Sequence, residues 1–413
     1  MKRAVALYKN NKKLFSFIGL SYFDKMVIFL LPLAVLALFK DKTVYVSLEY
    51  IYSIVLIVVP FLDLGLGGYF YYAYRNNNNP RLVIIQLLKT FHLIFLSIFC
   101  IGVALIAVHY LAYPFEEYIV YVVSRSIFVL AFTFLTAYYR LINKPHKALF
   151  ITISSNVLSL TFLLFYFFFD SEFGLWLVFV GQILFCILYF LWISKRVIFK
   201  RIRSYRSLNV IDMIRKSMLF SWPTIIQVFI LMYIANYGKI NALEKLSVDD
   251  GVLLSLTQRF SMLIQLTHVA IVGYLMKELF VSGELLVIKR KIFLKYLALL
   301  FTSVFIVIFI IMGYLYFNEN DYDPKFLFQI ISLIIGYTFF WCIFSYFEIY
   351  YSRENKNIIK MFLAIFNGIV FIIIFNIIKA GYLERITLSM FVSTMLTFLL
   401  SLIILKKRNY KFV

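Results

Sequence analysis

Charged and amide side chains inside long apolar segments are the residues of this sequence whose types and spacing could do chemistry. Arg259 sits eight residues into one such segment, which is roughly 12 Å below its end if the segment is helical. Gln258, Ser261, Gln265 and His268 recur at helical spacing and predict one polar face beside it. A guanidinium with amide neighbours suits a phosphate or pyrophosphate, because its planar donors bind two oxygens at once. The alternative is a structural ion pair with another segment.

Three more charges lie inside apolar segments of the N-terminal half of the chain. Arg125 sits at a depth similar to that of Arg259, between two serines. Asp24 and Lys25 are adjacent, so on a helix they point about 100° apart and need different partners. One of the two could face a substrate path while the other pairs with a neighbouring segment. Because a charge at a membrane helix centre costs about 2.5–3.5 kcal/mol on insertion scales, each should face a partner or an aqueous cavity.

Ion coupling has its own candidates, which are Asp24, Asp63 and His268. Asp63 follows Pro60 and precedes several glycines, a composition that weakens a membrane helix. A carboxylate there could carry a proton or answer a cation; a helix-breaking structural role is the alternative. At an offset of 205 residues, Asp63 falls opposite His268, a group able to titrate near neutrality.

Motifs for covalent catalysis, nucleotide binding and metal binding do not occur in the sequence. It contains no GxxxxGK[ST] loop, no HExxH and no GxSxG. The 3 cysteines are far apart within apolar segments, which favours small buried side chains over a metal site or a disulfide. We therefore expect no catalytic residue, no metal, no cofactor and no enzyme activity.

Membrane-spanning helices must position these side chains. The 413 residues are 63% hydrophobic and 15% charged, and the mean hydropathy is +0.91, so the bilayer is the solvent. Windows of about 20 apolar residues predict twelve spans. They cover residues 14–39, 46–74, 82–109, 117–140, 147–169, 174–194, 214–236, 251–276, 292–317, 326–351, 357–378 and 383–405. With this count most Lys and Arg fall on one side, which predicts that both termini are cytoplasmic.

A basic stretch, Lys195–Lys216, separates two halves of equal span number. It contains eight Lys and Arg but only one acidic residue. We therefore expect it to stay cytoplasmic and to attract anionic lipid. The net charge of +21 thus reflects span ends, not nucleic-acid binding. The predicted domains are an N-terminal lobe at 1–194, the linker at 195–216 and a C-terminal lobe at 217–413.

Two regions carry a family resemblance. The stretch Ser221–Ser247, followed by Leu256–His268, resembles the seventh and eighth spans of Wzx-type O-antigen flippases. These proteins belong to the multidrug/oligosaccharidyl-lipid/polysaccharide exporter superfamily. Leu62–Arg75, in the sequence LDLGLGGYFYYAYR, resembles that family's entry region.

The resemblance implies a fold, a cargo and a site. The fold would be an all-α polytopic membrane protein with two six-helix lobes in a V around a cationic cavity. Lys25, Arg125 and Arg259 would be the cavity cations. The cargo would be an undecaprenyl-pyrophosphate-linked oligosaccharide, moved by ion-coupled alternating access to the outer leaflet of the bacterial cytoplasmic membrane. Membrane lipids and other polysaccharide-assembly proteins would be the partners.

Two other functions stay open at this point. A drug/cation antiporter of the same superfamily would need carboxylates in its cavity; Asp24 and Asp63 allow it, whereas two buried arginines oppose it. An O-antigen polymerase acts on the same lipid carrier and typically has a long external loop. The longest loop expected here is only Tyr237–Asp250.

Overall fold

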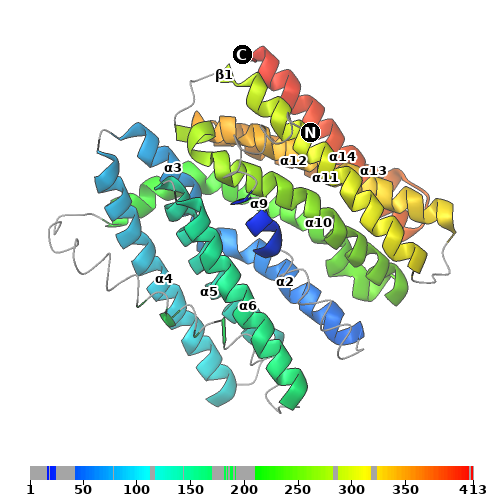
Figure 1. Ribbon diagram of the computed structural model, residues 1–413, viewed down its shortest axis with the longest axis horizontal. Helices are drawn as coiled ribbons and strands as arrows, with labels where there is room; N and C mark the ends of the chain where they lie inside the picture. Colours follow the sequence, from blue (N-terminus) through cyan, green and yellow to red (C-terminus); the bar gives the residue numbers. More distant parts are fainter. Residues whose placement is uncertain are drawn as a thin grey trace, which may run out of the picture. The chain divides into compact units, whose positions relative to one another are not determined.

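The computed structural model describes most of the chain as helices (Figure 1). The described residues are 16–24 without 18, 42–111 without 78, 117–169 without 143, six positions between 181 and 191, 210–281, 287–317, 323–408 and 411–412. Within them, nine helices are long and apolar enough to cross a membrane. The predicted spans 2 to 5 and 7 to 12 all coincide with helices. The protein is therefore an all-α, multi-pass membrane protein.

The chain forms two compact units. One comprises residues 23–225, and the other comprises residues 1–22 together with residues 226–413. The division falls within helix α9 (Val210–Lys245), close after Pro223, which interrupts the backbone hydrogen bonding of that helix. Much of the basic linker lies outside the described residues, so the predicted domain limits stay a prediction.

The unit of residues 23–225 is built around helix α5. Helices α2, α3, α4 and α6 each contact α5. Helices α4, α5 and α6 run side by side in cyan and green in Figure 1. The bounds are α2 Lys42–Leu62, α3 Leu66–Asn76, α4 Pro80–Leu111, α5 Glu117–Leu141 and α6 Pro145–Phe169. Buried residues of α2 recur every three or four positions and form one packed stripe. The rings of Phe91 on α4 and Phe134 on α5 stack with centroids 3.7 Å apart.

The second unit packs α12 against α14 and α10, and α14 against α13. Its elements are α10 Val248–Met276, the π-helical turn η3 Lys277–Val281, β1 Val287–Ile288, α11 Arg290–Phe317, α12 Pro324–Arg353, α13 Asn357–Ile377, α14 Tyr382–Lys407 and β2 Lys411–Phe412. The two short strands pair in parallel and join the end of the chain to the segment before α11. The Tyr22 hydroxyl forms a hydrogen bond with Thr267, which joins the segment around Tyr22 to α10.

Small hydroxyl side chains allow α14 to pack closely. Ser389, Ser393, Thr397 and Ser401 recur every four residues and are fully buried. The first three hydroxyls donate to carbonyl oxygens of their own helix, and Ser401 meets the Tyr351 hydroxyl at 3.1 Å. Small residues that satisfy their own hydrogen bonds are how membrane helices approach one another, because lipid supplies no hydrophobic driving force.

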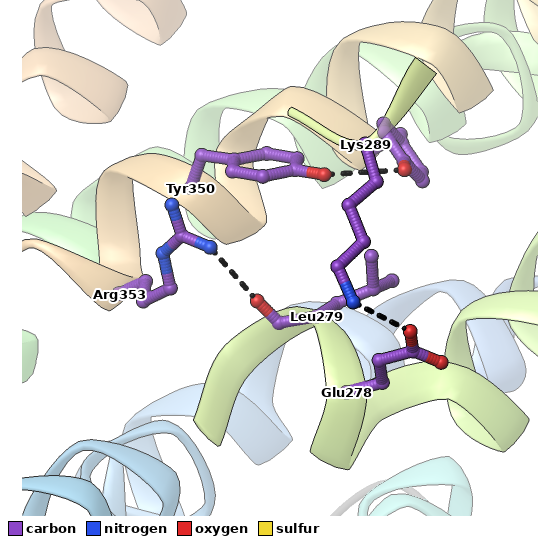
Figure 2. Close-up of polar contacts among 6 residues, drawn as sticks. Glu278, Leu279, Lys289, Tyr350 and Arg353 are labelled. Carbon is purple, nitrogen blue, oxygen red and sulfur yellow. Dashed lines mark hydrogen bonds and ion pairs between the residues drawn. The ribbon is translucent and has the colours of Figure 1, made fainter. Parts of the chain in front are cut away.

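A polar cluster holds the end of α12 to the turn after α10 (Figure 2). Arg353 is buried and its Nη1 donates to the Leu279 carbonyl at 3.2 Å, while its guanidinium lies 4.8 Å from the Tyr350 ring centre. Lys289 forms an exposed ion pair with Glu278 at 2.9 Å. These contacts span η3, α12 and the residue after β1.

The expected loop Tyr237–Asp250 is mostly helical, which corrects the sequence prediction. Helix α9 continues to Lys245 and α10 begins at Val248. The connection is therefore one short turn, because the polar residues after Tyr237 extend the helix instead of ending it.

Candidate functional site

Arg125 is the best-defined intramembrane cation among the described residues. Its Nη1 donates to Gln182 Oε1 at 2.9 Å, and Gln182 Nε2 donates to Ser159 Oγ at 2.9 Å. The guanidinium carbon also lies 5.0 Å from the Tyr52 ring centre and 4.9 Å from the Phe128 ring centre. Among the described residues no carboxylate pairs with Arg125. The side chain is 9% exposed, so a full positive charge is held inside the unit by neutral groups.

Helices α2, α5 and α6 build this site together with Gln182, which is also helical. Arg125 and Phe128 lie one turn apart on α5, Tyr52 comes from α2 and Ser159 from α6. The rings supply their negative faces to the cation, and the amide supplies a neutral acceptor. Such partners partly replace water around the guanidinium but leave its charge uncancelled.

Asp24 lies in the same unit and is anchored to α6. It is 1% exposed, and its Oδ1 accepts from Asn156 Nδ2 at 2.8 Å. Asp24 was predicted to need a partner of its own, and the neutral amide of Asn156 is one. Asp24 also takes part in other interactions. Lys25, the adjacent predicted cavity cation, lies outside the described residues.

Asp63 occupies a break in the predicted second span, as its neighbours Pro60 and Gly65 suggested. Helix α2 ends at Leu62 and α3 begins at Leu66. Asp63 Oδ2 accepts from the Gly67 amide at 3.2 Å, and this bond holds the first turn of α3. Its Oδ1 is buried and has no hydrogen-bond partner among the described residues.

Two serines of helix α9 form hydrogen bonds to the backbone at this break. Ser217 Oγ donates to the Leu64 carbonyl at 3.1 Å, and Ser221 Oγ donates to the Gly65 carbonyl at 2.9 Å. The two serines are one turn apart on α9 and satisfy carbonyl oxygens that lie at the interruption between the helices. Gly65 has a φ of +66°, and a Cβ there would lie 1.9 Å from Ser221 Cβ. Only glycine fits this conformation and this close approach.

Arg259 and its polar neighbours lie on α10 in the other unit. Arg259 is 5% exposed and is engaged in at least one side-chain interaction. Gln258 Nε2 donates to the Ala235 carbonyl of α9 at 3.3 Å. Ser261 lies 3.1 Å from Thr338 Oγ1 of α12, and Gln265 is half-buried. The predicted polar face exists, and three of its four members, Gln258, Ser261 and His268, connect α10 to its neighbours.

His268 is buried beside the aromatic rings of Tyr296 and Trp341. Its Nδ1 lies 2.8 Å from the Tyr296 hydroxyl, which donates its proton to the Cys342 carbonyl at 2.9 Å. Because a hydroxyl has only one proton, His268 Nδ1 must be the donor. The chain of bonds joins α10, α11 and α12, so His268 has a structural task. Asp63 belongs to the other unit, and the predicted pairing of the two stays a prediction.

Sequence reasoning missed a charged cluster between α9, α12 and α13. Gln227 Nε2 donates to Glu348 Oε1, and Lys360 interacts electrostatically with the same carboxylate. Gln227 and Lys360 are 2% and 4% exposed. Glu348 lies near the end of the predicted span 326–351, a position typical of the membrane interface. Its spacing of twelve residues from Lys360 across a tight turn was the available signal.

The predicted site residues thus separate into two groups. Arg125, Asp24 and Asp63 belong to one unit; the other contains Arg259, Gln258, Gln265 and His268. Within the described residues, no cluster of three or more His, Cys, Asp or Glu side chains could hold a metal ion.

Comparison with solved structures identifies the fold. A point mutant of the Vibrio cholerae MATE transporter VcmN superposes with a TM-score of 0.63 and 12% identity over 96% of both chains. A MATE protein in a bent conformation gives 0.63 and 15% identity over 97% of both chains. No family model matches the sequence, and no curated protein matches it. The chain has the fold of MATE transporters.

One further structure shows that this fold occurs with different pocket charges. A MOP-superfamily transporter from Pyrococcus furiosus Vc1 gives a TM-score of 0.61 and 15% identity over 97% of this chain and 96% of that one. That protein is described as having a binding pocket of reverse polarity, which suggests a different function for it.

Proposed function

We propose that this protein is a secondary transporter that moves an anionic, lipid-linked oligosaccharide from the inner to the outer leaflet of the bacterial cytoplasmic membrane. The MATE fold of the whole chain supports transport by alternating access. The substrate class rests on charge. An undecaprenyl-pyrophosphate-linked repeat unit presents two phosphate groups, which need cations within the membrane.

The buried guanidinium of Arg125 is the observation that carries this proposal. Placing a cation inside the membrane costs free energy. Such a cation therefore usually interacts with an opposite charge. No described acid answers Arg125, and only one of its five N–H donors has a described acceptor. The remaining donors can bind a diphosphate in the planar, two-point manner of a guanidinium.

The neutral cage around Arg125 suits a transporter better than an ion pair would. A fixed carboxylate would compete with the phosphate for the guanidinium and would weaken cargo binding. Gln182 and the two rings orient the side chain without cancelling its charge. Arg259 is the second candidate cation, on α10, and Gln258 and Gln265 are candidates for contacts with the sugar.

A drug/cation antiporter is the second candidate, and fold comparison by itself favours it. One solved structure with this fold, at a TM-score of 0.61, is described as a multidrug resistance MATE family transporter. The buried carboxylates of Asp24 and Asp63 fit cationic cargo or a coupling ion. A polymerase receives no support, because the connection between α9 and α10 is one short turn.

The test compares Arg125→Gln with Arg125→Lys in cells depleted of the native protein. We expect wild type to clear lipid-linked single repeats from the cytoplasmic leaflet, and Arg125→Gln to leave them trapped there. A loss of about 3 kcal/mol of charge-assisted hydrogen bonding would slow flipping roughly 100-fold. Arg125→Lys keeps the charge and should retain part of the activity.

The sidedness of the glycan, measured with an impermeant glycosidase or lectin, separates the candidates. Membrane abundance of each variant provides the control for folding. If depletion leaves glycan transport unchanged and instead raises accumulation of a cationic dye such as ethidium, the antiporter replaces the flippase. Normal transport by Arg125→Gln would remove Arg125 from the cargo path.

A further inference from the structure

An apolar groove runs between α13 and α14 near the turn that joins α12 to α13. It encloses about 490 Å³. Leu363 forms part of the floor and is 1% exposed, whereas Phe362 stands at the rim and is 61% exposed. Ile359, Leu400 and Ile404 complete the apolar walls. All of these residues belong to one unit, so the groove is a feature of that unit alone.

Two cations stand at one end of the groove. Lys407 is the last residue of α14 and Arg408 follows it, and both line the groove while being exposed. Neither has an ion pair among the described residues. Elsewhere in the same unit, the cations Lys289 and Arg353 are engaged with Glu278 and with the Leu279 carbonyl (Figure 2). The groove therefore ends in positive charge that nothing described neutralises.

We propose that this groove binds one anionic glycerophospholipid of the cytoplasmic leaflet. An acyl chain would pack along Leu363, Leu400 and Ile404, and the phosphate would lie between Lys407 and Arg408. The distribution of Lys and Arg predicts that this end of α14 is on the cytoplasmic side, where anionic lipids concentrate. Basic pockets between membrane helices on that side are typical sites for such headgroups.

The exposed apolar surface of α11 differs from the groove in charge. Helix α11 exposes Phe305 and Phe309, which are 61% and 77% exposed. These rings lie mid-helix, far from the basic residues at its start. They suit the exchanging lipid that surrounds any membrane protein. The combination of a concave apolar wall and a paired cationic end is what favours one bound anionic lipid at the α13–α14 groove.

The experiment is native mass spectrometry of the full-length, delipidated protein. It is titrated with dioleoyl-phosphatidylglycerol and, separately, with dioleoyl-phosphatidylcholine. We expect one phosphatidylglycerol to bind more tightly than the rest and than phosphatidylcholine. Lys407→Gln with Arg408→Gln should weaken that first binding roughly 30-fold, because both cations near the surface contribute to it.

Two further variants separate a groove from a diffuse charge effect. Ile404→Trp fills the groove but keeps both cations, so it should also weaken the first phosphatidylglycerol. Leu400→Trp serves the same purpose if Ile404→Trp does not fold, as judged by thermal unfolding and gel filtration. The matched control is Arg290→Gln with Lys291→Gln, which removes two exposed cations at the start of α11 and leaves the groove intact.

The outcomes are decisive in both directions. Loss of the tight lipid in the charge and filling variants, with the control unchanged, supports the site. Equal loss in the control, or wild-type binding by both filling variants, overturns it. Displacement of phosphatidylglycerol by a tenfold lower concentration of undecaprenyl phosphate would assign the groove to the lipid carrier instead. The proposed transport function does not enter this test, so either idea can fail alone.

Discussion

At the scale of single residues, the buried charges divide into those with charged neighbours and those without. Glu348 and Lys360 interact with each other inside one unit, and Gln227 adds a hydrogen bond to the carboxylate. Arg125 has only neutral partners among the described residues, and Asp63 keeps one buried oxygen without a hydrogen bond there. A buried charge that loses its oppositely charged neighbour destabilises the unit, whereas a buried charge without such a neighbour is available to a cargo or an ion.

The pair of Glu348 and Lys360 gives a residue-scale prediction. Lys360→Met removes the positive charge beside the Glu348 carboxylate and should destabilise the protein by roughly 2–4 kcal/mol, because a carboxylate left without its cation is poorly solvated. Glu348→Gln combined with Lys360→Met removes both charges and should restore much of the loss. The melting temperatures of the purified single and double variants measure the coupling. Additive losses would mean that the two side chains act independently.

At the scale of helices, the interruption between α2 and α3 shows why an element needs its neighbour. Pro60 and Gly65 weaken the second span, and Asp63 caps the new helix through the Gly67 amide. The carbonyl oxygens of residues 64 and 65 accept hydrogen bonds from serines of α9, which is distant in sequence, and the carbonyl of residue 65 also accepts from the Tyr69 amide of α3. A broken helix is tolerated in a membrane only when such partners exist.

Gly65→Ala tests this arrangement. The new Cβ would lie 1.9 Å from Ser221 Cβ and 2.3 Å from its Oγ, and the backbone has a φ of +66°. We expect a loss of roughly 2–3 kcal/mol or more in stability, since α9 must move away from the break. Thermal unfolding and the yield of monodisperse protein measure it.

Gly68→Ala is the matched control for that substitution. It lies one turn further along α3, and a Cβ there meets nothing within 4 Å. Alanine is the better helix former, so this variant should be as stable as wild type or slightly more stable. Equal behaviour of the two variants would show that the close approach of α9 is unimportant.

The helices were predictable because a span is a local property of composition, whereas the partners of a buried charge are not. Windows of apolar residues located the described helices, and Pro60 with the nearby glycines indicated the break at Asp63. No spacing indicated that Arg125 meets Gln182, 57 residues later, or that Asp24 meets Asn156, 132 residues later. Such contacts depend on which helices pack together. The Glu348 cluster was missed for the same reason, because a position near a span end does not indicate which side chains of other helices lie beside it.

At the scale of the whole molecule, direction matters for every function considered. A flippase and an antiporter with the MATE fold both move cargo between two defined sides, and the lipid groove requires the end of α14 to face the anionic leaflet. The excess of Lys and Arg at alternate span ends predicts that the turns after α12 and α14 are cytoplasmic. The short turn between α9 and α10 would then lie outside.

Cysteine accessibility tests this orientation in intact cells. Starting from a variant whose 3 native cysteines are replaced by serine, Ser247→Cys and Asn355→Cys place single thiols at two opposite turns. An impermeant maleimide should label Ser247→Cys in intact cells and Asn355→Cys only after permeabilisation, because Asn355 lies in the exposed turn between α12 and α13. Labelling of both after permeabilisation confirms that each thiol can react. The reverse pattern would place the basic ends outside, and the inward site of the lipid groove would be wrong together with the direction of transport.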